Sequence, residues 1–215
     1  MSDSPTQAEL AELRSQSAWF LSRFYLERPE PAFLAEVAAA LAAGASGEGQ
    51  DKDVQLLITT LTAQHEPLSA RLEVEFTRLL RGIQEGYGPP PPYEGLHRGG
   101  AAMDDCTLAV MHHYTNAGFA DIAPEAGPPD HLATELRFLA LLALREAEAH
   151  RAGENDVAQE RMAQQTDFLD QHLLAWLPHF AARIEAEAQE PFYPAVARLT
   201  LAFVQEARGE LELAS

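Results

Sequence analysis

Apolar residues recur at the spacing of three and four that is typical of amphipathic helices along most of the chain. The first run has Leu10, Leu13, Phe20, Leu21 and Phe24 on one face. Ser4 precedes Pro5, and Gln7 follows three residues after Ser4, so Ser4 is the predicted N-cap and Gln7 its capping-box partner. The pattern therefore predicts a helix from residue 4 to Arg28, which ends at the Pro-Glu-Pro sequence of residues 29–31.

Three further helices are predicted in the N-terminal half. One contains Phe33 and Val37 and ends at Gly44, where a glycine-rich loop begins. A helix over residues 54–61 comes next, and after Pro67 another runs over residues 68–81. The longest irregular segment follows at residues 82–100, with six glycines and four consecutive prolines. The proline run cannot be helical and favours extended geometry, so we expect this loop to separate two halves of the molecule.

The C-terminal half repeats the helical pattern. Its predicted helices comprise one from Met103 to Gly118, a largely apolar central one from residue 130 to Gly153, a third from residue 155 to Pro178, a short one near Ile184 and a last one after residue 194. Asp130 is the predicted N-cap of the central helix. The fold class is therefore all-α, with about eight to nine helices in a single domain over residues 1–215.

Composition narrows the possible functions. The chain of 215 residues is 47% hydrophobic and has a formal charge of −18. This charge repels nucleic acid and attracts a basic segment such as an arginine-rich peptide. The alternative is that the acidic surface only keeps the protein in solution. The single Cys106 excludes an intramolecular disulfide and fits a reducing compartment. No signal peptide or membrane-spanning run is recognised, so we expect a cytoplasmic protein without stable membrane insertion.

The sequence offers little support for catalysis. It contains no phosphate-binding glycine loop, nucleophile elbow, His-Glu-x-x-His pair or Cys-x-x-Cys motif. We therefore expect no catalytic residue, metal or cofactor. The competing hypothesis is a small metal-dependent hydrolase that uses His131 and Glu135, which lie one helical turn apart. An acidic helical scaffold without a binding groove is a weaker alternative.

Three segments in this order resemble one known family, the TorD/DmsD/NarJ family of redox-enzyme maturation chaperones. They are EFTRLLRG at 75–82 with GPPPPYEGLHRG at 88–99, PPDHLATELRFLALL at 128–142, and FLDQHLLAWLPHFAARIEAEAQEPFY at 168–193. The resemblance implies an all-helical chaperone of TorD type. It also implies binding of the twin-arginine signal peptide and body of a molybdoenzyme catalytic subunit until the molybdopterin cofactor is inserted.

The resemblance also selects residues for binding the signal peptide and client. They are Glu75, Phe76, Arg78, Leu79, Tyr93, Glu94, Pro128, Asp130 and His131. Carboxylates beside an apolar groove suit a peptide that carries two guanidinium groups next to an apolar stretch. Phe76 and Leu79 fit core packing equally well. The chain departs from the family pattern at Gly95 and Gly127, where family members often have serine and glutamate, respectively. The sequence is compatible with both a monomer and a domain-swapped dimer.

Overall fold

The computed structural model describes residues 5–44, 51–62, 68–82, 88–100, 105–119 and 122–214. Within these residues every regular element is a helix, and the one bridge of β type joins Tyr93 to His131. The all-α prediction is confirmed. The helices group into two compact units: unit 1 contains residues 1–26, 93–177 and 203–215, and unit 2 contains residues 27–92 and 178–202. The single domain over residues 1–215 stays a prediction.

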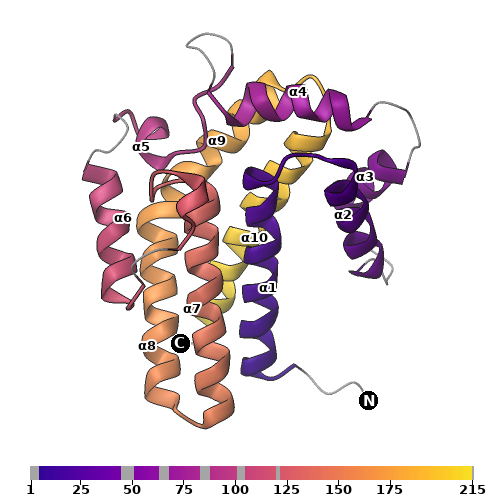
Figure 1. Cartoon of the computed structure of the whole chain (residues 1–215). Helices are drawn as coiled ribbons and strands as arrows, with labels where there is room; N and C mark the ends of the chain where they lie inside the picture. Colours follow the sequence, from indigo (N-terminus) through magenta and orange to yellow (C-terminus); the bar gives the residue numbers. More distant parts are fainter. Residues whose placement is uncertain are drawn as a thin grey trace. The chain divides into compact units, whose positions relative to one another are not determined.

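Unit 1 is built around three long helices, α1 (Gln7–Leu26), α7 (Leu132–Ala152) and α8 (Asn155–Phe168), of which α7 contacts both others (Figure 1). The short α5 (Glu94–His97), α6 (Asp105–Asn116) and the 3₁₀ helix η1 (Pro124–Ala126) complete its middle part. A π-helical segment, η2 (Leu169–Leu173), joins α8 to the first turn of α9 (Leu174–Glu187). The last turns of α10 (Phe192–Ala214) also belong to unit 1.

An aromatic cluster forms the centre of unit 1. Phe138 on α7 contacts Phe168 edge to face at 4.8 Å between ring centroids and Tyr114 on α6 at 4.6 Å. All three rings are buried, as the apolar spacing of the sequence predicted. Burial of rings of this size supplies much of the hydrophobic free energy of the unit, because each removes a large apolar area from water.

Unit 2 consists of α2 (Pro31–Gly44), α3 (Lys52–Thr62) and α4 (Leu68–Leu80), with the greater part of α9 and the first turns of α10. Its core includes Leu72, Phe76 and Phe180, which are all fully buried. The proline run of residues 89–92 is not helical, as expected. Gly88 has no room for a side chain, since a Cβ would lie 2.2 Å from the carbonyl oxygen of Arg78, so the loop passes directly against α4.

The structure corrects several predicted element boundaries. Helix α1 begins at Gln7, and its capping box is formed by Thr6 and Glu9, whose side chains bond each other's backbone N–H at 3.3 and 2.7 Å. The predicted cap Ser4 lies outside the described residues. Helix α1 ends at Leu26 instead of Arg28, and residues 94–97 of the long loop form the one-turn helix α5.

The predicted break at Pro178 is also wrong, because α9 runs through this residue to Glu187. Proline removes one backbone hydrogen bond inside a helix without always ending it. Among the described residues, no helix has the length and apolar character needed to cross a bilayer.

Candidate peptide-binding site

The predicted site residues fall in both units. Those on α4 of unit 2 are Glu75, Phe76, Arg78 and Leu79, and those in unit 1 are Tyr93, Glu94, Pro128, Asp130 and His131. Each group is therefore described by itself. The structure brings the members of each group together, and most of them are buried.

On α4, Glu75 and Arg78 form an ion pair with 2.6 Å between Oε1 of Glu75 and Nη2 of Arg78, in which Glu75 is buried and Arg78 is partly buried. The other carboxylate oxygen of Glu75 accepts from the backbone N–H groups of Gln189 and Glu190, at 2.9 and 3.3 Å. Arg78 also donates to the carbonyl oxygen of Glu187 at 2.8 Å, which is the last residue of α9. The pair therefore satisfies backbone groups that the helix end leaves open, and fixes the turn between α9 and α10.

Phe76 and Leu79 are core residues of unit 2, with 1% and 0% of their surface exposed. Phe76 contacts the ring of Tyr193, and the guanidinium of Arg81 lies 5.1 Å from its centroid. This burial favours the packing role for both residues. Contact between either residue and a peptide stays a prediction that requires α4 to expose this face.

In unit 1, the structure corrects the role of Asp130. The N-cap of α7 is His131, whose Nδ1 accepts the backbone N–H of Ala133 at 3.1 Å. The carboxylate of Asp130 instead accepts a hydrogen bond from the backbone N–H of Gly95 at 3.1 Å, and the backbone carbonyl oxygen of Asp130 accepts one from the N–H of Glu94 at 2.9 Å. Asp130 therefore holds the first turn of α5, and His131 starts α7.

Tyr93 and Pro128 complete this junction. The ring of Tyr93 meets the imidazole of His131 edge to face at 5.0 Å, and its hydroxyl donates to the carbonyl oxygen of Ala126 at 3.4 Å. The carbonyl oxygen of Pro128 accepts the backbone N–H of His131. Tyr93 and Pro128 are half-buried, whereas Asp130 and His131 are buried. The side of this junction that a ligand can reach is thus formed by Tyr93 and Pro128.

Glu94 is the centre of a buried polar cluster in unit 1. One carboxylate oxygen lies 2.5 Å from Nη1 of Arg98 and the other lies 2.8 Å from Nδ1 of His172. Arg98 also donates to the carbonyl oxygen of Gln171. His172 belongs to η2, and π-helical turns of this kind are rare and occur often at functional sites.

Two further carboxyl groups make this cluster rich in acid. Nε1 of Trp176 donates to Glu135 at 3.1 Å, and burial together with the negative charge of Glu94 raises the pKa of Glu135 well above its usual range. Burial also raises the pKa of Asp130, although the N–H of Gly95 opposes the shift. Among the described residues, no three His, Cys, Asp or Glu side chains are arranged to hold a metal ion.

Four members of this cluster were not assigned to the site from the sequence. They are Arg98, His172, Trp176 and Glu135, of which Glu135 was named from the sequence only for the competing hydrolase. The spacing of Glu94 and Arg98 at i and i+4 is a signal that sequence inspection can use. No such signal exists for His172 and Trp176, because their contacts depend on how η2 and α9 lie against α5 and α7.

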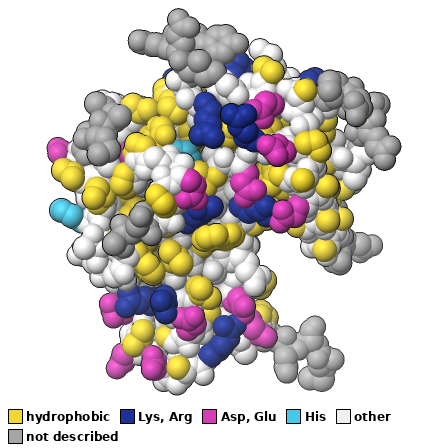
Figure 2. Space-filling model, in the orientation of Figure 1, with side chains coloured by type: hydrophobic (Ala, Val, Ile, Leu, Met, Phe, Trp, Pro, Cys, Tyr) yellow, Lys and Arg dark blue, Asp and Glu magenta, His cyan; other side chains and the backbone are white. Residues whose placement is uncertain are grey.

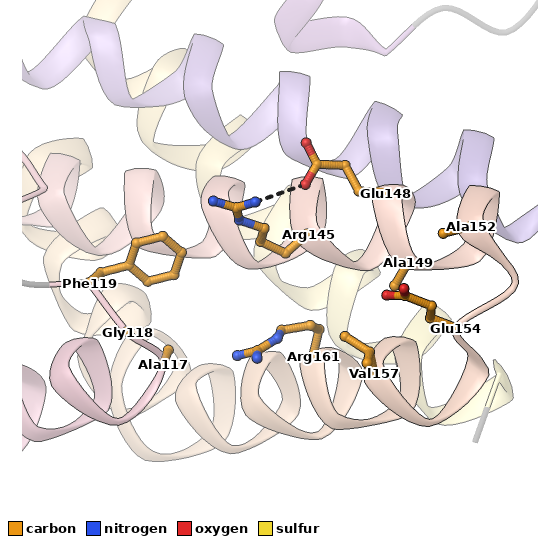
Figure 3. Close-up of a pocket in the computed structure, with 10 residues that line it drawn as sticks. All are labelled: Ala117, Gly118, Phe119, Arg145, Glu148, Ala149, Ala152, Glu154, Val157 and Arg161. Carbon is orange, nitrogen blue, oxygen red and sulfur yellow. Dashed lines mark hydrogen bonds and ion pairs between the residues drawn. The ribbon is translucent and has the colours of Figure 1, made fainter.

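Unit 1 also has a surface pocket of about 410 Å³ where α7 and α8 meet the end of α6 (Figure 3). Its lining comprises Ala117, Gly118, Phe119, Arg145, Glu148, Ala149, Ala152, Glu154, Val157 and Arg161. The side chains of Arg145 and Arg161 extend toward the end at which Phe119 lies. Arg145 pairs with Glu148 at 3.1 Å, so charges of both signs line this pocket. Its charge therefore selects no single kind of ligand.

Comparison with known proteins gives one consistent family. The family model described as nitrate reductase delta subunit matches residues 33–182. Chaperone protein TorD of Vibrio cholerae serotype O1 (strain M66-2) is 29% identical over 205 residues, covering 92% of this chain and 91% of the relative. The fold and these matches define the class of redox-enzyme maturation chaperones. The chain belongs to the nitrate reductase delta subunit family, and the resemblance to the TorD/DmsD/NarJ chaperones is confirmed.

Two assembly chaperones are more similar over a shorter stretch. The selenate reductase assembly chaperone protein of Thauera selenatis is 38% identical over 50% of this chain and 55% of its own length. The chlorate reductase assembly chaperone protein of Ideonella dechloratans is 40% identical over 54% of this chain and 58% of its own length. A crystal structure described as a putative redox enzyme maturation protein from Archaeoglobus fulgidus has a TM-score of 0.52 at 21% identity. It covers 93% of this chain and 94% of its own, and it supports the fold.

Proposed function

We propose that this protein is a cytoplasmic chaperone that binds the twin-arginine signal peptide and the apo catalytic subunit of a molybdopterin-containing oxidoreductase. It holds this client until the cofactor is inserted and the client is exported, and it acts by binding alone. The observation that carries the proposal is the family membership, with relatives named as chaperones of selenate and chlorate reductase assembly.

The physical character of the chain supports a basic peptide as ligand. A formal charge of −18 raises the encounter rate with a cationic leader and disfavours nucleic acid. The nine predicted site residues remain the proposed contacts, one group in unit 2 and one group in unit 1. Six of the nine are buried, and the proposed role of these six is to hold α5, α7 and the end of α9 in place. The other three, Tyr93, Pro128 and Arg78, offer accessible surface.

The direct test is calorimetric titration of the purified protein with synthetic leader peptides from candidate molybdoenzymes. Each leader is compared with a peptide in which both arginines are replaced by lysine, which keeps the charge and removes the planar guanidinium fork. We expect micromolar binding of one leader and weaker binding of its lysine counterpart. Equal binding of both peptides, or no binding of any leader, would contradict recognition of a twin-arginine signal.

A further inference from the structure

A ledge on unit 1 combines a partly exposed tryptophan, a carboxylate and an apolar pocket. Trp19 on α1 is 45% exposed, and the guanidinium carbon of Arg137 on α7 lies 4.7 Å from the centroid of its ring. Arg137 also forms an ion pair with Glu125 of η1, whose side chain is 54% exposed. Trp19 and Glu125 together thus form a guanidinium site that an arginine of this chain occupies.

Such a site has the chemistry that an incoming arginine needs. The face of an indole ring attracts a guanidinium, and a carboxylate beside it binds the N–H groups in the ring plane. The pKa of Glu125 is lowered, first by a hydrogen bond from its own backbone N–H and also by Arg137, so the carboxylate stays ionised at neutral pH. The side chain of Arg137 is 12% exposed, so its head is held between the two groups.

The apolar part of the ledge begins one residue before Glu125. Pro124 lines a pocket of about 70 Å³ together with Met111, Tyr114, Thr115, Ile122, Ala123, Gly127, Pro129 and Thr134. This lining has no charged residue, and the buried hydroxyl of Thr134 has no hydrogen-bond partner among the described residues. The pocket has room for one short aliphatic side chain, since its volume equals roughly two waters of liquid.

Figure 2 shows acidic and basic side chains beside one another over α1 and α7, and hydrophobic side chains over α6. We propose that this ledge receives an extended client segment, with an arginine of the segment on Trp19 and Glu125 in exchange for Arg137, and an aliphatic side chain of the segment in the pocket lined by Met111 and Pro124. Charge complementarity supports this occupant, because the chain carries −18 overall and the pocket lining offers no cation.

This inference rests on the proposed function and makes Arg137 an internal competitor of the leader. Removal of a competing guanidinium frees both Trp19 and Glu125, so Arg137→Gln should strengthen binding of an arginine-pair peptide by about threefold to tenfold. Glu125→Gln and Trp19→Ala should weaken it by about threefold to tenfold, because each removes one side of the site. A purely structural Arg137 would give no gain in affinity.

Matched controls come from the exposed pair Arg145 and Glu148 on α7. Arg145→Gln and Glu148→Gln change the net charge by the same amounts as Arg137→Gln and Glu125→Gln, away from Trp19. The pocket is tested by Thr115→Phe, which fills it, against His112→Phe on the same helix, which does not line it. Arg137→Lys is a second variant in case the glutamine variant unfolds, and a smaller gain in affinity is expected.

The experiment is fluorescence anisotropy with a synthetic peptide that has two adjacent arginines followed by an apolar run, with the thermal unfolding of each variant as a folding check. We expect opposite effects of Arg137→Gln and Glu125→Gln, and selective loss with Thr115→Phe. If wild type binds and Arg137→Gln matches Arg145→Gln, the competition is wrong while the chaperone proposal stands. If wild type binds a leader from a candidate molybdoenzyme but not this peptide, this inference alone is wrong. If wild type binds neither this peptide nor any leader, the proposed function fails and this inference fails with it.

Discussion

Unit 1 buries two polar clusters, and they differ in how their charges are balanced. In the first, Arg14 on α1 donates to Glu146 on α7 at 2.6 Å, to Gln165 on α8 at 3.0 Å and to Glu210 on α10 at 3.1 Å. In the second, the carboxyl groups of Glu94, Asp130 and Glu135 are all buried, and Glu94 pairs with His172. The arginine of this cluster, Arg98, has 40% of its side chain exposed.

The Arg14 cluster is also the one with the more complete hydrogen bonding. Gln165 donates to Glu146 at 2.6 Å, so the Arg14 cluster connects four helices through bonds between its own members. In the Glu94 cluster, Oδ1 of Asp130, Oε1 of Glu135 and Nε2 of His172 have no partner among the described residues. A connected buried network holds helices in register, whereas an acid-rich one with open atoms costs free energy that depends on pH.

The largest effect is expected from Arg14→Met. This change leaves Glu146 buried without its cation, which should lower the free energy of unfolding by about 3–5 kcal/mol. The double variant with Glu146→Met should regain most of this loss, because an apolar pair has no charge to compensate. Urea unfolding of the single and double variants measures both values. A loss below about 1 kcal/mol in the single variant would show that the ion pair is dispensable.

A smaller effect is expected in the acid-rich cluster from Trp176→Phe. Phenylalanine keeps an aromatic ring beside His97, which now stacks on Trp176 at 5.3 Å, but it removes the N–H that donates to Glu135. The unsatisfied oxygen should cost about 1–3 kcal/mol. Trp19→Phe, at a partly exposed ring, is the matched control. Phenylalanine keeps a ring face for the guanidinium of Arg137, so the stability should change by about 0.5 kcal/mol or less. Equal losses in the two variants would contradict the role of the indole N–H.

The next effect tests which residue caps α7. His131→Ala should cost about 0.5–2 kcal/mol, since it removes the acceptor for the N–H of Ala133, and His131→Asn should restore part of this stability because asparagine is a favoured N-cap. Thermal unfolding followed by far-UV circular dichroism measures the difference. If the asparagine variant is no better than alanine, the loss comes from the contact with Tyr93 and not from the cap.

This cap also shows where sequence reasoning stops. The apolar spacing of Leu132, Leu136 and Leu139 predicts α7 directly, because each helical turn returns a side chain to the core. Asp130 and His131 both carry an acceptor at the start of that helix, and local pattern favours Asp130. The choice falls on His131 because α5 takes the carboxylate of Asp130, and that contact joins residues 35 positions apart.

The same reasoning applies to the candidate site. The sequence and its family resemblance selected Glu94, Asp130 and His131, which the structure places together. Their burial was not foreseen, since charged residues are normally exposed. Glu94 pairs with Arg98, four residues later, and with His172 of η2. Only the pair with Arg98 could be seen in the sequence, as a helical i, i+4 spacing.

The smallest effect on stability is expected from Glu135→Gln. The difference between this variant and wild type should be near zero at low pH and should grow as the pH rises. The folded state raises the pKa of Glu135 above its ordinary value of 4.5, so folding favours the protonated acid. In wild type, the contribution of Glu135 to stability is therefore complete below about pH 4.5 and is lost as the pH rises through the folded-state pKa. Glutamine keeps an acceptor for Trp176 and cannot ionise. Its midpoint of thermal unfolding should equal that of wild type near pH 4.5 and exceed it near pH 8, whereas Glu148→Gln, at an exposed carboxylate, should show no such trend. A constant difference between wild type and Glu135→Gln over this pH range would mean that Glu135 titrates normally in the folded protein, and that the acid-rich cluster is no more costly than the Arg14 network.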